Sequence, residues 1–204
     1  MAEVSLLLWD IGGVLLSNGW DQAARQAAAE RFGLDPAEFE RRHGQVETDF
    51  ETGRTDLEAY LSATVFYLPR TFDREEFRRF MHARSTPHPV ALAFAREFRT
   101  AGRFVMAALN NESRDLNEYR IRTFHLREIF HLFLSSCYTC RRKPDPEAYR
   151  YALEITQRDL DEALFLDDRR ENVESAARLG LRTLWVRDPD RIREELASAG
   201  IVAG

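Results

Sequence analysis

The sequence has almost no lysine. Of its 29 basic residues, 28 are arginine, and Lys143 is the one lysine. Arginine is a planar fork that is always charged, whereas lysine is a compact point charge on a thin stem. Two explanations are open for an ammonium at this position. Either a narrow pocket holds an anion beside a carboxylate, or a surface lysine has simply been retained.

Cysteine is also scarce, with Cys137 and Cys140 in the motif CYTC. A CxxC pair can be redox-active or can form half of a zinc site. The five histidines are scattered and no second CxxC exists, so a second pair of zinc ligands is missing. The segment RRKPDP follows the pair where a redox motif would continue into a helix. We therefore interpret the two residues as free thiols, which is compatible with a reducing compartment.

Long apolar runs and an excess of positive charge are absent as well. No run approaches the roughly 20 residues of a membrane span, and the N-terminal VSLLLWD soon ends on a charge, unlike a signal peptide. The net charge of −5 and the pI of about 5.6 argue against binding to nucleic acid or to an anionic membrane. We expect a soluble, cytoplasmic protein with no nucleic-acid or membrane partner. The sequence does not indicate an oligomeric state.

Five short apolar runs have the length and composition of strands that are buried on both faces. They are residues 4–9, 104–109, 129–136, 163–166 and 182–186. Helical patterns separate the later runs: one begins with Asp145 as N-cap and Pro146 in the first turn, and another ends on Gly180. This alternation predicts an α/β fold with a doubly wound, Rossmann-like parallel sheet.

Residues 18–85 differ, because they show helical patterns only. Asp35 has the position of an N-cap, Thr55 and Glu58 have the spacing of a capping box, and residues 73–83 are amphipathic. We predict a helical cap of residues 18–85, inserted after the first strand of an α/β core. That core would comprise residues 1–17 and 86–204. Open α/β sheets bind ligands beyond the carboxyl ends of their strands, so the cap would cover the active site.

Polar side chains follow the carboxyl ends of the predicted strands. They are Asp10, Asn110 and Asn111, Lys143, and the pair Asp167 and Asp168. One aspartate after a strand is usually a turn or cap residue, but in a doubly wound sheet these ends converge. Three crowded carboxylates repel one another unless a cation lies among them. Mg²⁺ suits such a site, because it takes oxygen ligands and keeps waters that a phosphate can replace.

Four segments carry a family resemblance that extends over nearly the whole chain. They read LLLWDIGGVLL, AALNNES, RRKPDPEAY and FLDDRRENVESAARLGL. The sequence resembles the haloacid dehalogenase-like (HAD) hydrolases, most of which are phosphatases. It is most similar to the small helical-cap branch that includes α-D-glucose-1-phosphate phosphatase and the N-terminal phosphatase domain of soluble epoxide hydrolase.

The resemblance implies a role for each of these polar residues. Asp10 would be the nucleophile that attacks phosphorus. The metal ligands would be Asp10, the carbonyl of Gly12 and Asp168, and Asp167 would support them. Lys143 would hold the phosphate and the charge of the nucleophile. Asn110, together with the backbone at Asn111, would bind phosphate oxygens.

Two positions depart from the family pattern. Asn110 stands where most members have serine or threonine, and Gly12 replaces the aspartate that usually serves as general acid and base. A positioned general acid contributes about 10²–10⁴-fold to the rate, so its loss would favour substrates with good leaving groups. His43 and Glu47 are conceivable substitutes, although we expect both on an exposed helix face. Trp20 lies near the hinge, where it either lines the pocket or packs the hinge.

The favoured function is a Mg²⁺-dependent phosphatase that hydrolyses a small phosphorylated metabolite through an aspartyl-phosphate intermediate. Two alternatives remain. One is a catalytically weak relative that binds a phosphorylated ligand or a protein partner, which Gly12 favours. The other is a metal-independent haloacid dehalogenase, for which the acidic pair after the fourth strand has no evident use.

Overall fold

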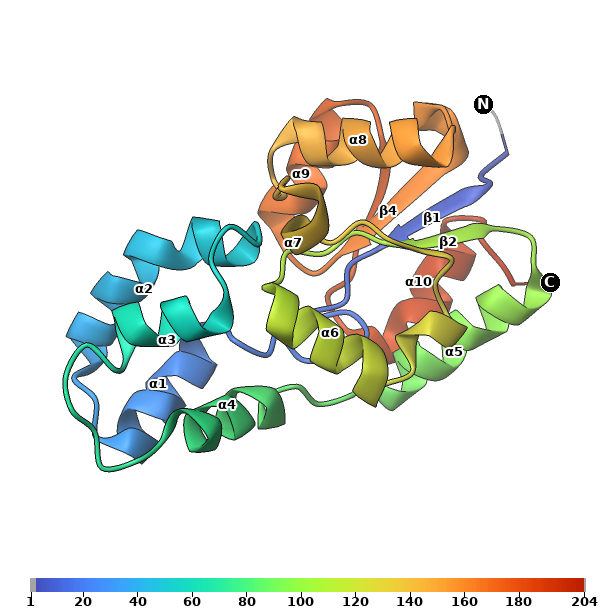
Figure 1. The fold of residues 1–204 in the computed structure, drawn as a ribbon. Helices are drawn as coiled ribbons and strands as arrows, with labels where there is room; N and C mark the ends of the chain where they lie inside the picture. The colour runs from blue at the N-terminus through green and yellow to red at the C-terminus, as the bar shows by residue number, and fades with distance from the viewer. Residues whose placement is uncertain (1–2, 204) are drawn as a thin grey trace.

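The computed structural model describes residues 3–203 and shows a five-stranded parallel sheet with helices on both faces (Figure 1). The strand order is β3-β2-β1-β4-β5. The strands are β1 (Leu6–Trp9), β2 (Val105–Ala108), β3 (Leu132–Phe133), β4 (Ala163–Asp167) and β5 (Arg182–Trp185). The predicted doubly wound α/β fold is therefore confirmed.

Two of the predicted strands differ from the expectation. β3 is much shorter than the apolar run 129–136, because a 3₁₀ turn at Leu126–Glu128 precedes it and the short helix α7 (Ser136–Thr139) follows it. β5 is only partly buried, because it lies at the edge of the sheet. Burial on both faces is thus confined to the inner strands.

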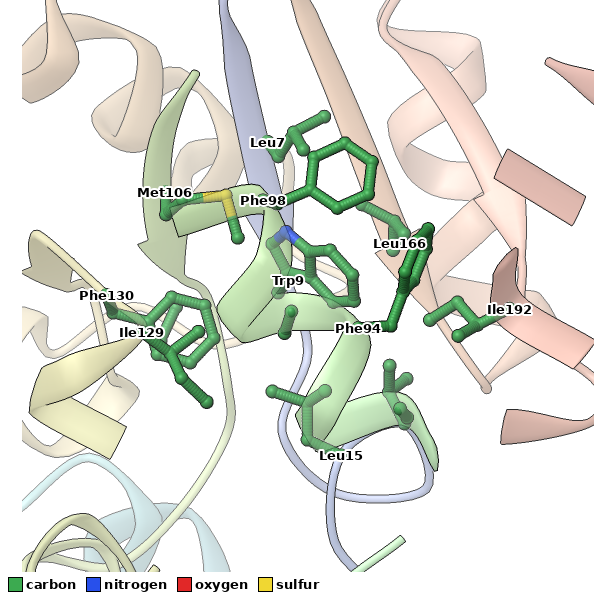
Figure 2. Packing of buried hydrophobic residues seen from close by; sticks show 14 of the residues in the cluster. Leu7, Trp9, Leu15, Phe94, Phe98, Met106, Ile129, Phe130, Leu166 and Ile192 are labelled. Atoms are coloured by element: carbon green, nitrogen blue, oxygen red, sulfur yellow. The ribbon is translucent and has the colours of Figure 1, made fainter. Parts of the chain in front are cut away.

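The two faces of the sheet have separate apolar cores. Side chains alternate along a strand, so Leu7 and Trp9 point to one face and Leu6 and Leu8 to the other. In Figure 2, Trp9 lies among side chains from the neighbouring strands and from a helix on its face, including an edge-on contact with Phe98 at 6.4 Å between ring centroids. The helices on this face are α5 (Pro89–Ala101) and α10 (Ile192–Ser198), and those on the other are α8 (Pro146–Thr156) and α9 (Arg170–Arg178).

Between β1 and α5 the chain forms four helices, which Figure 1 shows grouped on one side of the molecule. They are α1 (Gln22–Phe32), α2 (Pro36–Glu51), α3 (Leu57–Thr64) and α4 (Arg74–Ala83). They share an apolar cluster of their own, which Leu116 of α6 (Arg114–Thr123) joins from the sheet side. The segment is helical as expected, and its division from the core as a functional cap stays a prediction.

Helix capping agrees with the sequence at two positions and differs at a third. The side chains of Asp35 and Asp145 accept hydrogen bonds from the first turns of α2 and α8, as predicted. At α3 the N-cap is Asp56, which accepts from the Ala59 N–H at 2.8 Å, so the capping box predicted for Thr55 is wrong. Asp56 is itself a strong N-cap residue one position later, which explains the shift.

The chain order places the site between two strands. From β1 the chain continues to β2 on one side, and it later crosses to β4 on the other side of β1. The crevice beyond the carboxyl ends of β1 and β4 is therefore the switch point at which open α/β sheets bind ligands. Among residues 3–203, no helix has the length and apolar character needed to cross a lipid bilayer.

Candidate active site

Three aspartates meet at the carboxyl ends of β1 and β4. Trp9 pairs with Leu166 in the parallel ladder, and the N–H of Asp10 donates to the Leu166 carbonyl at 2.9 Å. This register places Asp10 beside the end of β4. One carboxylate oxygen from each of Asp10, Asp167 and Asp168 lies within 4.8 Å of the other two. The sequence prediction that these acids converge agrees with the geometry.

Lys143 joins two of these carboxylates. Its Nζ lies 3.0 Å from Asp10 Oδ1 and 2.6 Å from Asp167 Oδ2, and the residue is only 3% exposed. Burial alone would lower the pKa of Lys143, but the charges of Asp10 and Asp167 more than reverse this and raise it. The ammonium therefore stays charged. The interpretation of Lys143 as a surface residue is excluded by its burial.

Asp167 is fully buried and surrounded by donors. Besides Lys143, the Arg169 N–H donates to its Oδ1 at 2.7 Å, and Asn172 Nδ2 lies 3.1 Å from both carboxylate oxygens. Both oxygens of Asp167 are thus held by protein groups. This arrangement suits a residue that orients Lys143.

Asp168 is different, because one of its oxygens has no partner. Oδ2 accepts from Asn18 Nδ2 at 3.1 Å, whereas Oδ1 is buried without a hydrogen bond to any part of the chain that the structure describes. Gly13 packs directly against this side chain. A Cβ at Gly13 would lie 2.0 Å from Asp168 Oδ2, and the backbone there has φ +70°, so only glycine fits.

The electrostatics of the site fit a divalent cation. Burial raises the pKa of Asp10 to about 8; the nearby Lys143 opposes this shift, and Asp167 and Asp168 add to it. Burial likewise raises the pKa of Asp168. A nucleophilic carboxylate must be ionised, and a cation among these oxygens would favour the ionised form. The all-oxygen donor set and the unpaired Asp168 oxygen are what Mg²⁺ requires.

Replacing Asp168 with alanine is expected to weaken Mg²⁺ binding by at least about 10-fold, since even groups that only support metal ligands are worth 10–100-fold. Isothermal calorimetry with MgCl₂ measures this directly and needs no substrate. Asp190→Ala, which removes an exposed acid on the surface, is the matched control. Equal affinity of Asp168→Ala and wild type would place any metal elsewhere.

A cavity of about 250 Å³ lies next to Asp10 and Lys143. Its lining comes from two sides, which enclose it together. The sheet side supplies Asp10, Gly12, Asn111, Glu112, Arg120, Lys143, Arg169 and Asn172, and the segment around α1 and α2 supplies Asn18, Trp20, Asp21, Gln22, Arg25, His43, Glu47, Phe50 and Glu51. The lining is strongly polar and carries charges of both signs.

Three residues of this lining correct or refine expectations from the sequence. His43 is 6% exposed and lines the cavity, so its assignment to an exposed helix face is wrong. The Glu47 side chain is 40% exposed, and it also lines the cavity. The reason is that α2 lies with this face over the sheet edge, which a single helix pattern does not reveal. Trp20 lines the cavity, which agrees with one of the two roles considered for it, and it also packs in the apolar cluster of α1–α4.

The two asparagines after β2 lie in different surroundings. Asn111 lines the cavity, and its side chain bridges the backbone of Lys143 by accepting from its N–H at 2.9 Å and donating to its carbonyl at 2.8 Å. Asn110 is buried and bonds to Asn117 and Ser135, and it is not part of the cavity lining. Asn111 thus positions the lysine loop, and the contacts of both residues with phosphate stay predictions.

Sequence reasoning missed several residues of the site. Asn18 holds Asp168, Asn172 holds Asp167, and Arg169 lies at the cavity with no hydrogen bond or ion pair from its guanidinium to residues 3–203. Burial would lower the pKa of Arg169, but the surrounding acids, Asp10 first among them, raise it. Arg169 and Asn172 directly follow the acidic pair in DDRREN, which was the available signal. Asn18 carried no such signal.

Glu51, at the end of α2, is a second lining residue with a strongly raised pKa. Burial raises its pKa from 4.5 to about 7, although Arg142 lies 2.7 Å away and opposes the shift. The folded protein therefore binds a proton at Glu51 between pH 4.5 and 7 that the unfolded chain releases. The free energy of unfolding must fall as pH rises through this window.

Glu51→Gln removes this titration. The free energy of unfolding of the variant, relative to wild type, should rise by on the order of 2–3 kcal/mol between pH 4.5 and 7.5 and then level off. This figure is smaller than the whole pKa shift would give, because the Glu51 side chain is 24% exposed and solvent screens its charge. Urea unfolding at a series of pH values measures it. A difference that does not change with pH would contradict the raised pKa.

Comparisons with known proteins show which family the chain belongs to and which solved structures share its fold. A family model described as haloacid dehalogenase-like hydrolase matches residues 4–180. Bifunctional epoxide hydrolase 2 of Rattus norvegicus is 30% identical over 133 residues, which is 63% of this chain and 24% of that protein. The same enzyme of Sus scrofa is 35% identical over 71 residues, which is 35% of this chain and 13% of that protein. The chain thus spans about a quarter or less of the length of these curated relatives.

Solved structures with the same fold include enzymes of more than one chemistry. A HAD family enzyme of Bacteroides thetaiotaomicron, in complex with magnesium and inorganic phosphate, has a TM-score of 0.74 at 18% identity, covering 89% of this chain and 93% of that one. A dehalogenase has a TM-score of 0.65 at 17% identity, covering 91% and 86%. At these identities the likeness shows the fold. Since the family model spans most of the sequence, the chain belongs to the haloacid dehalogenase-like hydrolases.

Proposed function

We propose that the protein is a Mg²⁺-dependent phosphatase that hydrolyses a small phosphomonoester. The observation that carries the proposal is the buried Lys143 ammonium, held between Asp10 and Asp167. In this proposal the ammonium supplies positive charge for a phosphate. Asp168 Oδ1, which has no hydrogen-bond partner among the described residues, supplies a ligand for a cation. A small phosphorylated metabolite in the cytoplasm is the partner that we propose.

In this mechanism a carboxylate oxygen of Asp10 attacks phosphorus, and the bond from phosphorus to the ester oxygen breaks. The ester oxygen leaves with the bonding electron pair and takes its proton from solvent water, and an aspartyl-phosphate remains on Asp10. Water then attacks phosphorus, which releases phosphate and restores the carboxylate. Lys143 offsets negative charge on Asp10 and on the phosphoryl oxygens throughout. A bound Mg²⁺, held by Asp10, Asp168 and the Gly12 carbonyl, would supply further charge stabilisation.

Gly12 gives this site an unusual feature, because no side chain there can protonate the leaving oxygen. The space that such a side chain would use is partly taken by Asn18, whose Oδ1 would lie 3.0 Å from a Cβ at Gly12. Asn18 is in turn bonded to Asp168. We therefore expect a preference for esters whose leaving groups need little protonation, such as aryl, acyl and anomeric sugar phosphates.

The similar fold of a dehalogenase keeps a second chemistry under consideration. A dehalogenase would also use an aspartate nucleophile, but it would attack carbon and release halide. The unpaired Asp168 oxygen and the crowding of three acids favour the metal-dependent reaction instead. A protein that binds a phosphorylated ligand without turnover is the third candidate, and the glycine at position 12 favours it.

The test is a panel of phosphorylated metabolites and p-nitrophenyl phosphate, assayed with Mg²⁺ and again with EDTA. Turnover that requires Mg²⁺ supports the proposal. Halide release from 2-haloacids in EDTA would establish the dehalogenase. Binding of phosphate esters without turnover would establish the ligand-binding candidate.

A further inference from the structure

Arg120 of α6 is a buried arginine at the edge of the cavity, and it is paired with a buried carboxylate. The residue is 1% exposed, and its Nη1 lies 2.8 Å from Oε2 of Glu112, whose side chain is 9% exposed. Loss of either partner of such a pair leaves the other charge buried without compensation, which is strongly unfavourable. The pair therefore fixes the position of the guanidinium.

The other two nitrogens of Arg120 bond to segments that are far apart in the sequence. These segments are the two connections between the sheet and α1–α4, one after β1 and the other before α5. Nη2 donates to the carbonyls of Asn18, at 3.0 Å, and of Ser17, at 3.4 Å. Nε donates to Ser85 Oγ at 3.0 Å. The connections also bond to each other, because Ser17 Oγ donates to the Arg84 carbonyl at 2.8 Å. One guanidinium thus joins both connections to α6.

Gly19 shows how closely the first connection passes the guanidinium. A Cβ at Gly19 would lie 1.6 Å from Arg120 Nη2, and the backbone there has φ +75°, which favours glycine. Because no side chain stands between them, the carbonyls before Gly19 reach the guanidinium directly. Arginine suits this place, since its planar fork presents several donors in fixed directions, whereas a lysine ammonium is a single point.

Asn18 connects this guanidinium to the acidic cluster. Arg120 holds its backbone carbonyl, and its side-chain Nδ2 donates to Asp168 Oδ2 at 3.1 Å. The other oxygen of that carboxylate, Oδ1, is buried and accepts no hydrogen bond from residues 3–203. A donor on one carboxylate oxygen restricts the rotation of the group and leaves the second oxygen for a cation. Carboxylates that bind metals are generally oriented by such outer hydrogen bonds.

Resting on the metal site of the proposed function, we propose that Arg120 is a positioning residue for Asp168 and that it acts through Asn18. The buried pair with Glu112 fixes Arg120, and Arg120 fixes the Asn18 backbone. The Asn18 amide then orients the Asp168 carboxylate, so that the oxygen without a partner is kept for Mg²⁺. The metal site therefore depends on a residue of α6 that supplies no ligand itself.

The first test measures Mg²⁺ affinity by isothermal calorimetry and needs no substrate. Asn18→Ala removes the amide, and Arg120→Lys keeps the charge beside Glu112 but loses the fork that holds the backbone. Each variant should bind Mg²⁺ about 10-fold more weakly than wild type or worse, as is usual when a group that orients a metal ligand is lost. Arg122→Lys, the same change at an exposed position of α6, should leave the affinity unchanged.

The double variant Asn18→Ala/Arg120→Lys tests whether Arg120 acts through Asn18. Once the amide is absent, the guanidinium has nothing left to position, so the double variant should bind Mg²⁺ as weakly as Asn18→Ala alone. Independent effects would add in free energy, and the two losses of affinity would multiply. Multiplied losses, or an unchanged affinity in Asn18→Ala, would overturn the inference. If thermal melts show that Arg120→Lys does not fold, the nearly isosteric Glu112→Gln, which removes the charge that holds Arg120, takes its place.

Rescue by Mg²⁺ distinguishes positioning from general damage to the site. With p-nitrophenyl phosphate, Asn18→Ala should need at least about 10-fold more Mg²⁺ for half its maximal rate and should regain most of the wild-type kcat at saturating Mg²⁺. A kcat that stays low at saturating Mg²⁺ would contradict the inference. If wild type binds no Mg²⁺, the proposed metal-dependent function fails and this inference fails with it. If wild type and both single variants bind Mg²⁺ equally well, only the positioning role is wrong.

Discussion

Asp10→Asn should lower turnover by about 10⁴-fold or more while the protein stays folded, because an amide of almost the same shape is not a nucleophile. Asn can still accept the hydrogen bond that the Ile11 N–H gives to Asp10 Oδ1 at 2.8 Å. Steady-state assays on a Mg²⁺-dependent substrate measure the loss. Unchanged rates at equal purity would refute the assignment of Asp10.

Folding of Asp10→Asn can be predicted separately. Burial raises the pKa of Asp10 to about 8, so holding the residue ionised costs folding free energy at any pH above its ordinary value near 3.8. Removing the charge should therefore leave the protein at least as stable as wild type at pH 7, and Lys143 keeps Asp167 as a partner at 2.6 Å. A thermal melt provides the control, because an inactive variant with an unchanged melting temperature has lost chemistry and not structure.

Lys143→Arg should lose most activity, by about 10²-fold or more, even though the positive charge is kept. The ammonium sits 3.0 Å from Asp10 and 2.6 Å from Asp167, and the ring centroid of Phe165 lies 5.3 Å from it. A planar guanidinium is wider, and it cannot occupy this buried position without displacing a carboxylate or the ring. The measurement is kcat/KM on the same substrate as for Asp10→Asn.

The control for this variant is Lys143→Met, which keeps the length of the side chain and removes the charge. If shape matters as well as charge, both variants lose activity. Near-wild-type kcat/KM in Lys143→Arg would show that charge alone is required. The rarity of lysine in this chain would then have no explanation in the site.

The sequence by itself determined the sheet and the meeting of the acids. Short apolar runs that alternate with helices can form only a few topologies, and parallel strands bring their carboxyl ends to one edge. The positions of Asp10, Asp167 and Asp168 after such runs are therefore enough to predict that the three side chains meet. A place for Lys143 beside these acids could also be predicted, because a compact ammonium fits a narrow pocket that is too small for the planar guanidinium of arginine.

The tertiary structure decided what depends on distant segments. How α2 lies over the sheet edge turns His43 and Glu47 into the cavity, and a helical pattern shows only that one face is more apolar than the other. The raised pKa of Glu51 follows from burial that this contact creates. Asn18 reaches Asp168 across 150 positions of sequence. Each depends on packing between elements far apart in the chain, and local propensity carries no information about such packing.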